Sequence, residues 1–288
     1  MAETKRMRRI AVIGSGTMGN GIAHVAALAG LEVVLYDIAE EALARGTANI
    51  ARNMDRQLRS GRLEADEKTA ALSRIQATDD LARAVSDAGL AVEAVPEDAS
   101  LKYRLFAELD RLAPPAAILA SNTSSISITT MGARTARPDR VIGMHFMNPV
   151  PVMRLVEVVR GLRTSEETVR AVVELATRLG KTPVEVNDFP GFVSNRILMP
   201  MINEAIFALT EGVAEAEAID AVMRMGMNHP MGPLALADLI GLDTCLGILE
   251  VLHRELGDDR YRPAPLLRKY VAAGWLGRKS GRGFYSHE

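Results

Sequence analysis

The sequence of 288 residues predicts a doubly wound, mostly parallel α/β sheet with a helical-hairpin insertion, followed by a smaller all-helical domain. Three observations predict this fold class. Short β-rich runs alternate with helical stretches in the first half, one pair of helical segments interrupts that alternation, and no β-rich run follows residue 186. We therefore expect the domain boundary near Asn187, with one domain at residues 1–187 and the other at residues 188–288.

The expected elements can be placed along the chain. Seven β-rich runs are expected to form the sheet: Arg9–Ile13, Glu32–Tyr36, Leu90–Ala94, Ala116–Ala120, Val141–His145, Arg154–Val159 and Pro183–Val186. Helices are expected between them at Thr17–Ala29, Leu101–Leu112 and Ser165–Leu179. The insertion, about residues 40–74, should form two helices, Glu40–Arg59 and Ala65–Ser73. Four helices are expected after the boundary: Phe192–Glu211, Ala216–Met225, Pro233–Leu256 and Pro265–Ala273.

Composition narrows the class of protein. Hydrophobic residues make up 48% and charged residues 24%, as in soluble globular proteins, and the net charge of -2 gives no global reason to bind nucleic acid or an anionic membrane. The single cysteine, Cys245, lies in an apolar run, so we expect a core residue and no metal site. No apolar run approaches the ~18 residues of a membrane span, and the apolar stretch near the start is too short for a signal peptide. A cytoplasmic protein is expected.

A glycine-rich run, GSGTMG at residues 14–19, has the spacing G-x-G-x-x-G and lies between an expected strand and an expected helix. The spacing alone is a weak signal, but a second strand ends in an acidic residue about 20 residues later, which is the context of a dinucleotide-binding, Rossmann-type fold. Gly14 allows the tight turn, Gly16 lets a pyrophosphate approach the backbone, and Gly19 lets the helix pack against the strand. The motif therefore predicts a dinucleotide cofactor.

The residues around this turn also predict which dinucleotide binds. Thr17 and Met18 begin the helix, whose unpaired N–H groups and partial positive charge attract phosphates. Asp37, at the end of the second strand, can accept hydrogen bonds from the adenosine ribose hydroxyls. Its charge would repel the 2′-phosphate of NADP, so we expect NAD.

Chemistry in such a fold is expected at the carboxyl ends of the strands. The candidates there are Glu97, Lys102 and the runs 121–125 and 145–148. Oxidation of a secondary alcohol needs a base for the hydroxyl proton, and histidine is favoured because its ordinary pKa of about 6.5 lies near working pH. Of the five histidines, only His145 stands at the carboxyl end of an expected strand.

His145 has a candidate partner in Glu157. The sequence reads as two β runs joined by a proline-containing turn, and an antiparallel hairpin centred near Pro151 places His145 opposite Glu157. A carboxylate that accepts a hydrogen bond from the imidazole Nδ1–H fixes the tautomer and stabilises the imidazolium formed on proton uptake. The alternative is a solvent-facing glutamate on an edge strand.

Six runs together resemble the 3-hydroxyacyl-CoA dehydrogenase family: VIGSGTMG, ILASNTSS, HFMNPVPVMRLVEVV, DFPGFVSNRILMPMINEA, NHPMGPLALADLIGLD and AGWLGRKSGRGFY. The likeness extends nearly end to end, and within the family it is closest to the bacterial single-function 3-hydroxybutyryl-CoA dehydrogenases. It implies NAD-dependent interconversion of (3S)-3-hydroxyacyl-CoA and 3-oxoacyl-CoA in fatty-acid or butanoate metabolism. It also implies a homodimer assembled through the helical domain.

The resemblance implies a role for each matching residue. His145 takes the place of the catalytic base and Glu157 that of its carboxylate partner. Ser124 corresponds to the serine that hydrogen-bonds the substrate oxygen at C3, and Asn195 to the asparagine that helps hold the thioester.

Three further residues match positions that line the nicotinamide side of the cofactor pocket in the family: Glu97, Lys102 and Asn148. The chain has Met147 where the family pattern leads us to expect a second phenylalanine. This apolar exchange leaves the catalytic set intact.

The resemblance also suggests a role for the helical hairpin. Arg45, Arg52, Arg56 and Arg59 share one helical face, and Arg62 follows directly. Coenzyme A carries a 3′-phosphate and a diphosphate, which suit a cationic stripe on a projecting arm. We expect Arg52, Arg56 and Arg59 to contact the CoA part of the substrate, although an arginine stripe is also typical of a solvated helix face.

Three alternatives remain. One is a related dehydrogenase acting on a sugar acid or a β-hydroxyacid without CoA, against which the arginine-bearing arm argues. Another is a non-catalytic, crystallin-like relative that keeps the NAD pocket, against which the set Ser124, His145, Glu157 and Asn195 argues. A third is a detached piece of a multifunctional β-oxidation protein, but the sequence contains no hydratase-like segment. The length of the acyl chain and the physiological direction stay open.

Overall fold

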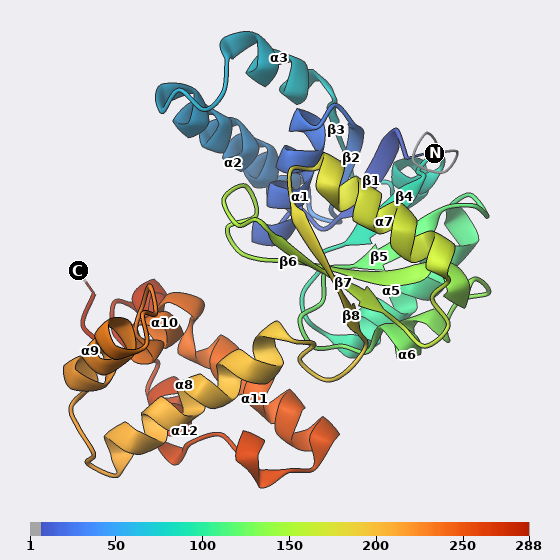
Figure 1. Cartoon of the computed structure of the whole chain (residues 1–288). Coiled ribbons are helices and arrows are strands. Elements are labelled where there is room, and N and C mark those ends of the chain that lie inside the picture. Colours follow the sequence, from blue (N-terminus) through green and yellow to red (C-terminus); the bar gives the residue numbers. More distant parts are fainter. Residues whose placement is uncertain (1–6, 288) are drawn as a thin grey trace. The chain divides into compact units, whose positions relative to one another are not determined.

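The structure is a computed structural model and describes residues 7–287 (Figure 1). Its eight strands form one sheet in the order β3-β2-β1-β4-β5-β6-β7-β8. Their bounds are β1 Arg9–Ile13, β2 Glu32–Tyr36, β3 Ile75–Thr78, β4 Leu90–Glu93, β5 Ile118–Ser121, β6 Val141–Phe146, β7 Leu155–Arg160 and β8 Thr182–Asn187. All neighbouring strands are parallel except β6 and β7, so the predicted doubly wound, mostly parallel sheet is confirmed.

Helices cover the sheet because its central strands are apolar on both faces. The helices of this part are α1 Thr17–Leu28, α2 Glu40–Arg59, α3 Ala65–Ser73, α4 Leu81–Val85, α5 Ala99–Leu112, α6 Ile128–Gly132 and α7 Glu166–Arg178. Apolar side chains of α1, α2, α3 and α7 form one buried cluster with the side chains on one face of the strands. This packing fixes the strand ends, where the candidate site lies.

The inserted arm is formed by α2 and α3, with the bounds expected from the sequence. Figure 1 shows α2 extending away from the strands. Its buried residues are Leu43, Gly46, Ile50 and Met54, spaced three or four apart. One face of α2 is therefore packed against the rest of the domain, and the other carries charged residues.

Three short elements were not expected from the sequence. The edge strand β3 has two exposed residues among its four, so it lacks the buried apolar pattern of the central strands. Helices α4 and α6 have five residues each, too few for a helical period to show. Both begin at a side chain that caps the helix, Asp80 in α4 and Ser127 in α6.

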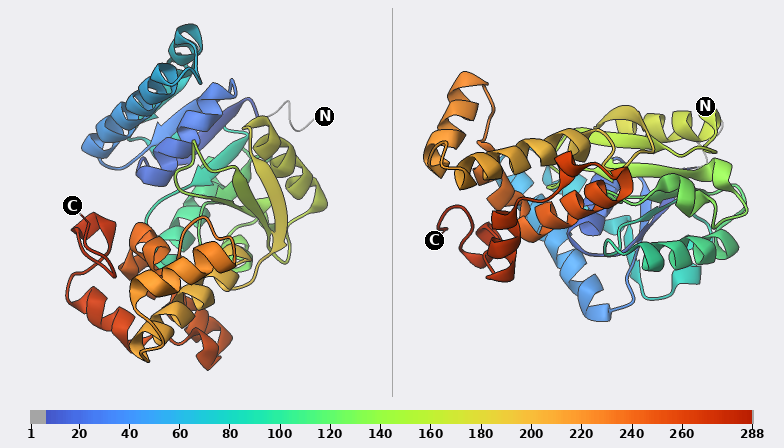
Figure 2. Two further views of the ribbon diagram at one scale, coloured as in Figure 1. Left: turned by 60° about the vertical axis from the view of Figure 1, so that its left-hand side comes forward. Right: turned by 90° about the horizontal axis from the view of Figure 1, so that it is seen from below.

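The chain divides after Asp188 into two compact units. The second consists largely of helices, seen in orange and red in Figure 2: α8 Ser194–Thr210, α9 Ala216–Gly226, α10 Pro233–Ile240, α11 Leu242–Leu256 and α12 Pro265–Ala272. Cys245 is part of its buried apolar core, and burial raises the pKa of this thiol to about 12. The expected core position of the cysteine is confirmed.

The single helix expected at Pro233–Leu256 is wrong. The structure has two helices there, α10 and α11, which meet at Gly241. The φ of Gly241 is 105°, a value that a right-handed helix does not allow and that glycine adopts without strain. The apolar pattern continues across the break, so helical periodicity alone concealed it.

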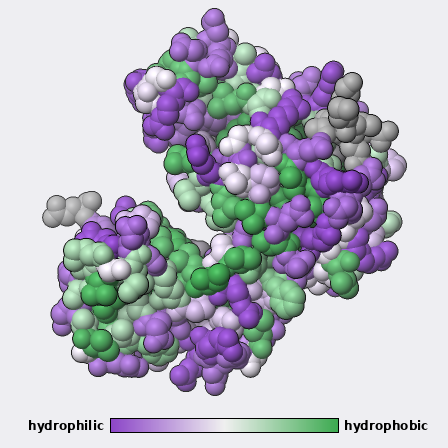
Figure 3. Space-filling view, viewed as in Figure 1, coloured by the Kyte–Doolittle hydropathy of each residue, from purple (hydrophilic) through white to green (hydrophobic). Residues whose placement is uncertain are grey.

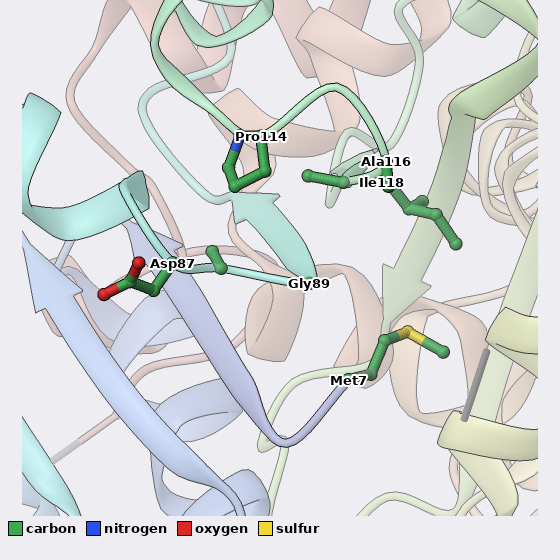
Figure 4. A pocket seen from close by; sticks show the side chains of 8 residues that line it. Met7, Asp87, Gly89, Pro114, Ala116 and Ile118 are labelled. Carbon is green, nitrogen blue, oxygen red and sulfur yellow. The ribbon is translucent and has the colours of Figure 1, made fainter. Parts of the chain in front are cut away.

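A small pocket of about 190 Å³ lies at the amino ends of β1, β4 and β5 (Figure 4). Its lining includes Met7, Gly89 and Ile118, and its one ionisable residue is Asp87. Asp87 pairs with Arg9 at 3.6 Å, and its side chain is 74% exposed. The lining of this pocket offers no convergent polar groups, in contrast to the carboxyl ends of the strands. Among residues 7–287, no helix is long and apolar enough to cross a membrane.

Candidate active site

The glycine-rich turn joins β1 to α1 at the carboxyl edge of the sheet. Gly14 has a φ of 102°, and a Cβ there would lie 2.7 Å from the carbonyl oxygen of Ala94. A Cβ at Gly19 would lie 1.7 Å from the oxygen of Gly14. Both positions therefore require glycine for the turn itself. At Gly16 no described atom lies within 4 Å of a Cβ, so the space beside that backbone is open to a ligand.

Asp37 lies directly after β2 and faces this turn. Its Oδ2 accepts hydrogen bonds from the backbone N–H and the hydroxyl of Ser15, each at 2.8 Å. The side chain of Ser15 is thus a contact that the sequence analysis missed, because the x positions of the motif are unconstrained. These two bonds fix the carboxylate beside the turn, where it can meet a ribose.

A cavity of about 900 Å³ opens at the turn. The predicted cofactor residues Gly14, Gly16, Thr17, Met18 and Asp37 all line it. The other predicted cofactor residues, which are all described, are not among its lining: Gly19, Glu97, Lys102 and Asn148. The cavity is of the size that small-molecule and cofactor sites have.

The arm supplies one wall of this cavity. Arg45, Gly46 and Asn49 of α2 line it, as do Arg104 and Glu108 of α5. A Cβ at Gly46 would lie 2.8 Å from the oxygen of Ser15, so glycine lets α2 approach the glycine-rich turn closely. From the sequence, Arg45 was expected only in the arginine stripe of the arm, and the other four residues were not predicted.

His145 lies near the end of β6 and is paired with β7. The pairing is antiparallel and sets His145 opposite Glu157, as predicted. His145 Nδ1 lies 2.8 Å from Glu157 Oε2, and the two residues are 6% and 2% exposed. The alternative of a solvent-facing glutamate on an edge strand is wrong, because β8 covers the other edge of β7. The pair has the geometry of an oriented imidazole base.

The second ring nitrogen of His145 meets the loop after β5. Ser124 Oγ lies 3.0 Å from His145 Nε2. Ser124, His145 and Glu157 therefore form one chain of hydrogen bonds along the carboxyl edge of the sheet. The hairpin register predicted the pair of His145 and Glu157, whereas the resemblance implied Ser124 only as a contact of the substrate oxygen. The same Nε2 is the atom that would exchange a proton with a substrate.

Glu97 and Lys102 support the loop that follows β5 and carries Ser124, which we call the serine loop. Glu97 Oε1 accepts hydrogen bonds from the Thr123 hydroxyl at 2.5 Å and from the Ser124 N–H at 2.9 Å. Its Oε2 lies 3.1 Å from Lys102 Nζ. Burial alone would raise its pKa, but the Lys102 ammonium and the hydrogen bonds hold the pKa of Glu97 below its usual range.

Glu93, the last residue of β4, was not singled out from the sequence. It is fully buried, and its Oε1 accepts from Lys102 Nζ and from the Val95 N–H, both at 2.7 Å. Burial raises the pKa of Glu93, and Lys102, Ser121 and Val95 oppose that rise. A carboxylate inside an apolar strand run is a signal that could have identified it.

Asn148 follows β6 and is exposed. The loop after it is held by Lys181, which is 9% exposed and donates to the carbonyl oxygens of Val150 and, at 2.8 Å, Met153. Lys181 was not predicted, because nothing near it in the sequence indicates two carbonyl partners.

Asn195 lies in the second unit, on the first turn of α8, and is 8% exposed. Its predicted role toward the thioester stays a prediction.

The remaining predicted residues, Arg52, Arg56 and Arg59, are exposed on α2 and line a hollow of about 330 Å³ together with Asp55 and Leu58. Three guanidinium groups around one hollow can bind an anionic group such as a phosphate.

Comparison with known proteins places the chain among dehydrogenases. The 3-hydroxyacyl-CoA dehydrogenase NAD binding domain matches residues 9–189, and the C-terminal domain of the same family matches residues 191–287. A probable 3-hydroxybutyryl-CoA dehydrogenase of Bacillus subtilis is 58% identical over 282 residues, covering 98% of each chain.

Two other relatives add structure and substrate range. The crystal structure of (S)-3-hydroxybutyryl-CoA dehydrogenase from Ralstonia eutropha has a TM-score of 0.94 and 50% identity, covering 98% of this chain and 99% of that one. A 3-hydroxyadipyl-CoA dehydrogenase of Escherichia coli is 44% identical over 280 residues, which are 97% of this chain and 59% of that protein.

Proposed function

Because the chain belongs to the 3-hydroxyacyl-CoA dehydrogenase family, we propose that it interconverts (3S)-3-hydroxybutyryl-CoA and acetoacetyl-CoA with NAD. The observation that carries the proposal is the position of His145 between Ser124 and Glu157 at the carboxyl edge of the sheet. The same edge holds the glycine-rich turn and the cavity beside it. The names of the Bacillus and Ralstonia relatives favour the four-carbon substrate.

The residues present fit the nicotinamide dinucleotide. The open space at Gly16 admits the pyrophosphate, and the first N–H groups of α1 point their partial charge toward it. Asp37 accepts hydrogen bonds from the adenosine ribose, and the exposed side chain of Ile38 offers an apolar contact in the same cavity. When bound, NAD supplies the acceptor for the hydride that leaves C3 of the substrate.

The proton is handled by the protein. In oxidation, His145 Nε2 takes the proton from the C3 hydroxyl, while Ser124 holds the same oxygen by a hydrogen bond. Glu157 keeps the proton of Nδ1 in place and stabilises the imidazolium that forms. In reduction, the imidazolium returns the proton to the C3 oxygen. Asn195 holds the thioester group in this proposal.

The arm binds the nucleotide part of CoA in this proposal. Arg52, Arg56 and Arg59 surround one hollow on α2, so a phosphate there can meet several guanidinium groups. Glu97, Lys102 and Asn148 stay predicted neighbours of the nicotinamide. A cytoplasmic location and a place in fatty-acid or butanoate metabolism stay predictions from the sequence.

We further propose that the protein is a homodimer assembled through residues 188–288, its substrate and dimerisation domain, with residues 1–187 forming the NAD-binding domain. Apolar side chains on the surface of the second unit support the dimer, and Figure 3 shows part of this surface. Val213, Val222, Met225 and Met227 are between 59% and 79% exposed. Val222 and Met225 lie three residues apart on α9 and so share one helix face, and exposed apolar surface of this kind is typical of an interface. In sedimentation, the wild type should be a dimer, and the double variant Val222→Asp, Met225→Asp should be a monomer. A monomeric wild type would contradict the proposal.

The test of the proposed activity is an assay of purified protein with NADH and acetoacetyl-CoA, followed by the absorbance of NADH. We expect turnover that is lost with free acetoacetate, and oxidation of the (3S) but not the (3R) thioester. Four-, eight- and sixteen-carbon thioesters and 3-hydroxyadipyl-CoA decide the acyl preference. Equal turnover of free acetoacetate and its CoA thioester would contradict the proposal.

A further inference from the structure

We propose that Glu93 and Lys102 are positioning residues that, through Glu97, hold the loop carrying Ser124 in register with His145. This inference rests on the proposed dehydrogenase activity and deepens it. It gives Lys102 a role in supporting the loop that carries Ser124, in addition to the position near the nicotinamide that the family resemblance implies. The contacts that carry it all lie within the first unit.

The base of the support is buried in the sheet. Glu93 is opposite Ser121 in the pairing of β4 with β5, and its Oε2 accepts a hydrogen bond from the Ser121 hydroxyl at 2.5 Å. Both residues are fully buried. Glu93 thus ties together the ends of the two strands from which the loop residues Glu97 and Ser124 depart, because Glu97 follows β4 and Ser124 follows β5.

Lys102 connects this base to the loop. It lies on the first turns of α5 and is 1% exposed. Its Nζ contacts Glu93 Oε1 at 2.7 Å and Glu97 Oε2 at 3.1 Å. A buried ammonium with two carboxylates is held in one geometry, because losing either contact would leave a charge without its partner in a medium of low polarity.

Glu97 transmits that position to the loop. One oxygen, Oε2, faces Lys102, and the other, Oε1, accepts from Thr123, Ser124 and Ser125. The donors include the backbone N–H groups of Ser124 and Ser125, at 2.9 and 3.1 Å, so the bonds fix the main chain as well as the side chains. Ser124 Oγ then lies 3.0 Å from His145 Nε2.

The consequence concerns catalysis and not cofactor affinity. A displacement of Ser124 by about 1 Å would misalign the substrate oxygen and the imidazole, and misplacement of that size can cost about 10²-fold in rate. Glu93 is fully buried and is absent from the lining of the cavity at the glycine-rich turn. Removing its charge should therefore lower kcat and leave the binding of NADH unchanged.

The experiment compares Lys102→Met and Glu93→Gln with a matched control, Arg137→Met. Arg137 forms an ion pair at 2.7 Å with Asp110, which lies on the same helix as Lys102, α5. Both side chains are mostly buried, at 13% and 14% exposure. The control therefore removes an ion pair from α5 without touching the serine loop. For each variant, kcat and KM with acetoacetyl-CoA, the Kd of NADH from its fluorescence, and Tm are measured.

We expect Lys102→Met to lower kcat at least about tenfold. Glu93→Gln, which keeps the shape of the side chain, should lower kcat less, with a Kd of NADH within about twofold of wild type. Arg137→Met should keep the wild-type kcat whatever its Tm. Adding Glu97→Gln to Lys102→Met should cost little more than the larger single effect, because both act through one chain of bonds.

Three results would overturn the inference. A rise in the Kd of NADH that matches the loss of activity in Glu93→Gln would mean that the buried pair acts on cofactor binding and not on the loop. An equal fall of kcat in Arg137→Met would reduce the effect to general loosening of α5. Wild-type kcat in both Glu93→Gln and Lys102→Met would show that neither residue positions the loop that carries Ser124. If Lys102→Met does not fold, Glu93→Gln alone decides. Turnover by the wild type tests the proposed function, whereas the ratio of variant to wild type tests this inference.

Discussion

The two regions proposed to contact substrate differ in how their side chains are held. At the carboxyl edge of the sheet, His145 and Glu157 are 6% and 2% exposed and joined at 2.8 Å. On the arm, Arg52 and Arg56 are exposed, and each donates to an asparagine three residues earlier on the same helix. The first region is fixed by tertiary structure, and the second by one turn of helix.

The difference teaches where large functional effects are expected. A buried pair that is held in one hydrogen-bonding geometry stabilises the transition state fully, because its side chains need not rearrange during the reaction. Exposed charges are screened by salt and pay side-chain entropy when they bind. Changes in the dyad, which is the pair of His145 and Glu157, should therefore lower kcat by orders of magnitude. Changes in the arm should raise KM by small factors.

The largest effect is expected for His145→Gln. General-base catalysis typically contributes about 10²–10⁴-fold, so kcat should fall by at least that order while the Kd of NADH stays unchanged. Steady-state kinetics in both directions checks this. A His145→Gln variant with more than about a tenth of wild-type kcat would break the comparison by moving the base elsewhere.

An intermediate effect is expected for Asp37 in the cofactor cavity, because its side chain is half-buried. Asp37→Ser should shift the preference from NADH toward NADPH by about tenfold, or about 1.4 kcal/mol, by removing the charge repulsion. Arg45, which lines the same cavity, supplies a cation for the 2′-phosphate, so adding Arg45→Ala should reverse the gain. Asp37→Asn removes the charge and keeps the shape of the side chain, so it tests whether the charge alone sets the preference for NADH. A wild type that already prefers NADPH tenfold would contradict the role of Asp37.

The smallest effect is expected on the arm. Neutralising Arg52 and Arg56 together should raise KM for acetoacetyl-CoA several-fold and leave KM for a truncated pantetheine thioester unchanged. The wild-type KM for the CoA thioester should also rise with salt, because the contacts are exposed. Equal changes with both thioesters would leave the stripe as a solvated helix face and sharpen the contrast with the dyad.

Residues close together in the sequence made the dyad and the cofactor turn predictable. A turn centred on Pro151 sets the register of β6 and β7, and the register alone places His145 opposite Glu157. The turn at residues 14–19 likewise follows from local glycine chemistry, with Asp37 one strand away. Short-range rules suffice where the chain itself brings the partners together.

The parts that escaped prediction depend on contacts between distant elements. Lys181 binds carbonyl oxygens about thirty residues earlier, as the contacts with Val150 and Met153 show. Gly46 lines the cofactor cavity only because α2 packs on the glycine-rich turn. The break at Gly241 was missed for another reason, since the apolar periodicity on its two sides agrees. No pattern along the chain distinguishes these residues from their neighbours.

The central claim is that His145 and Glu157 act as one unit, and a double-mutant cycle tests it most directly. The kcat of wild type, His145→Gln, Glu157→Gln and the double variant is measured at one pH with saturating substrate. Glu157 acts only through the imidazole in this account, so Glu157→Gln should lower kcat heavily in the wild type and hardly at all when His145 is already glutamine. The same fold-loss in both backgrounds would show that the two residues are independent and would contradict the account.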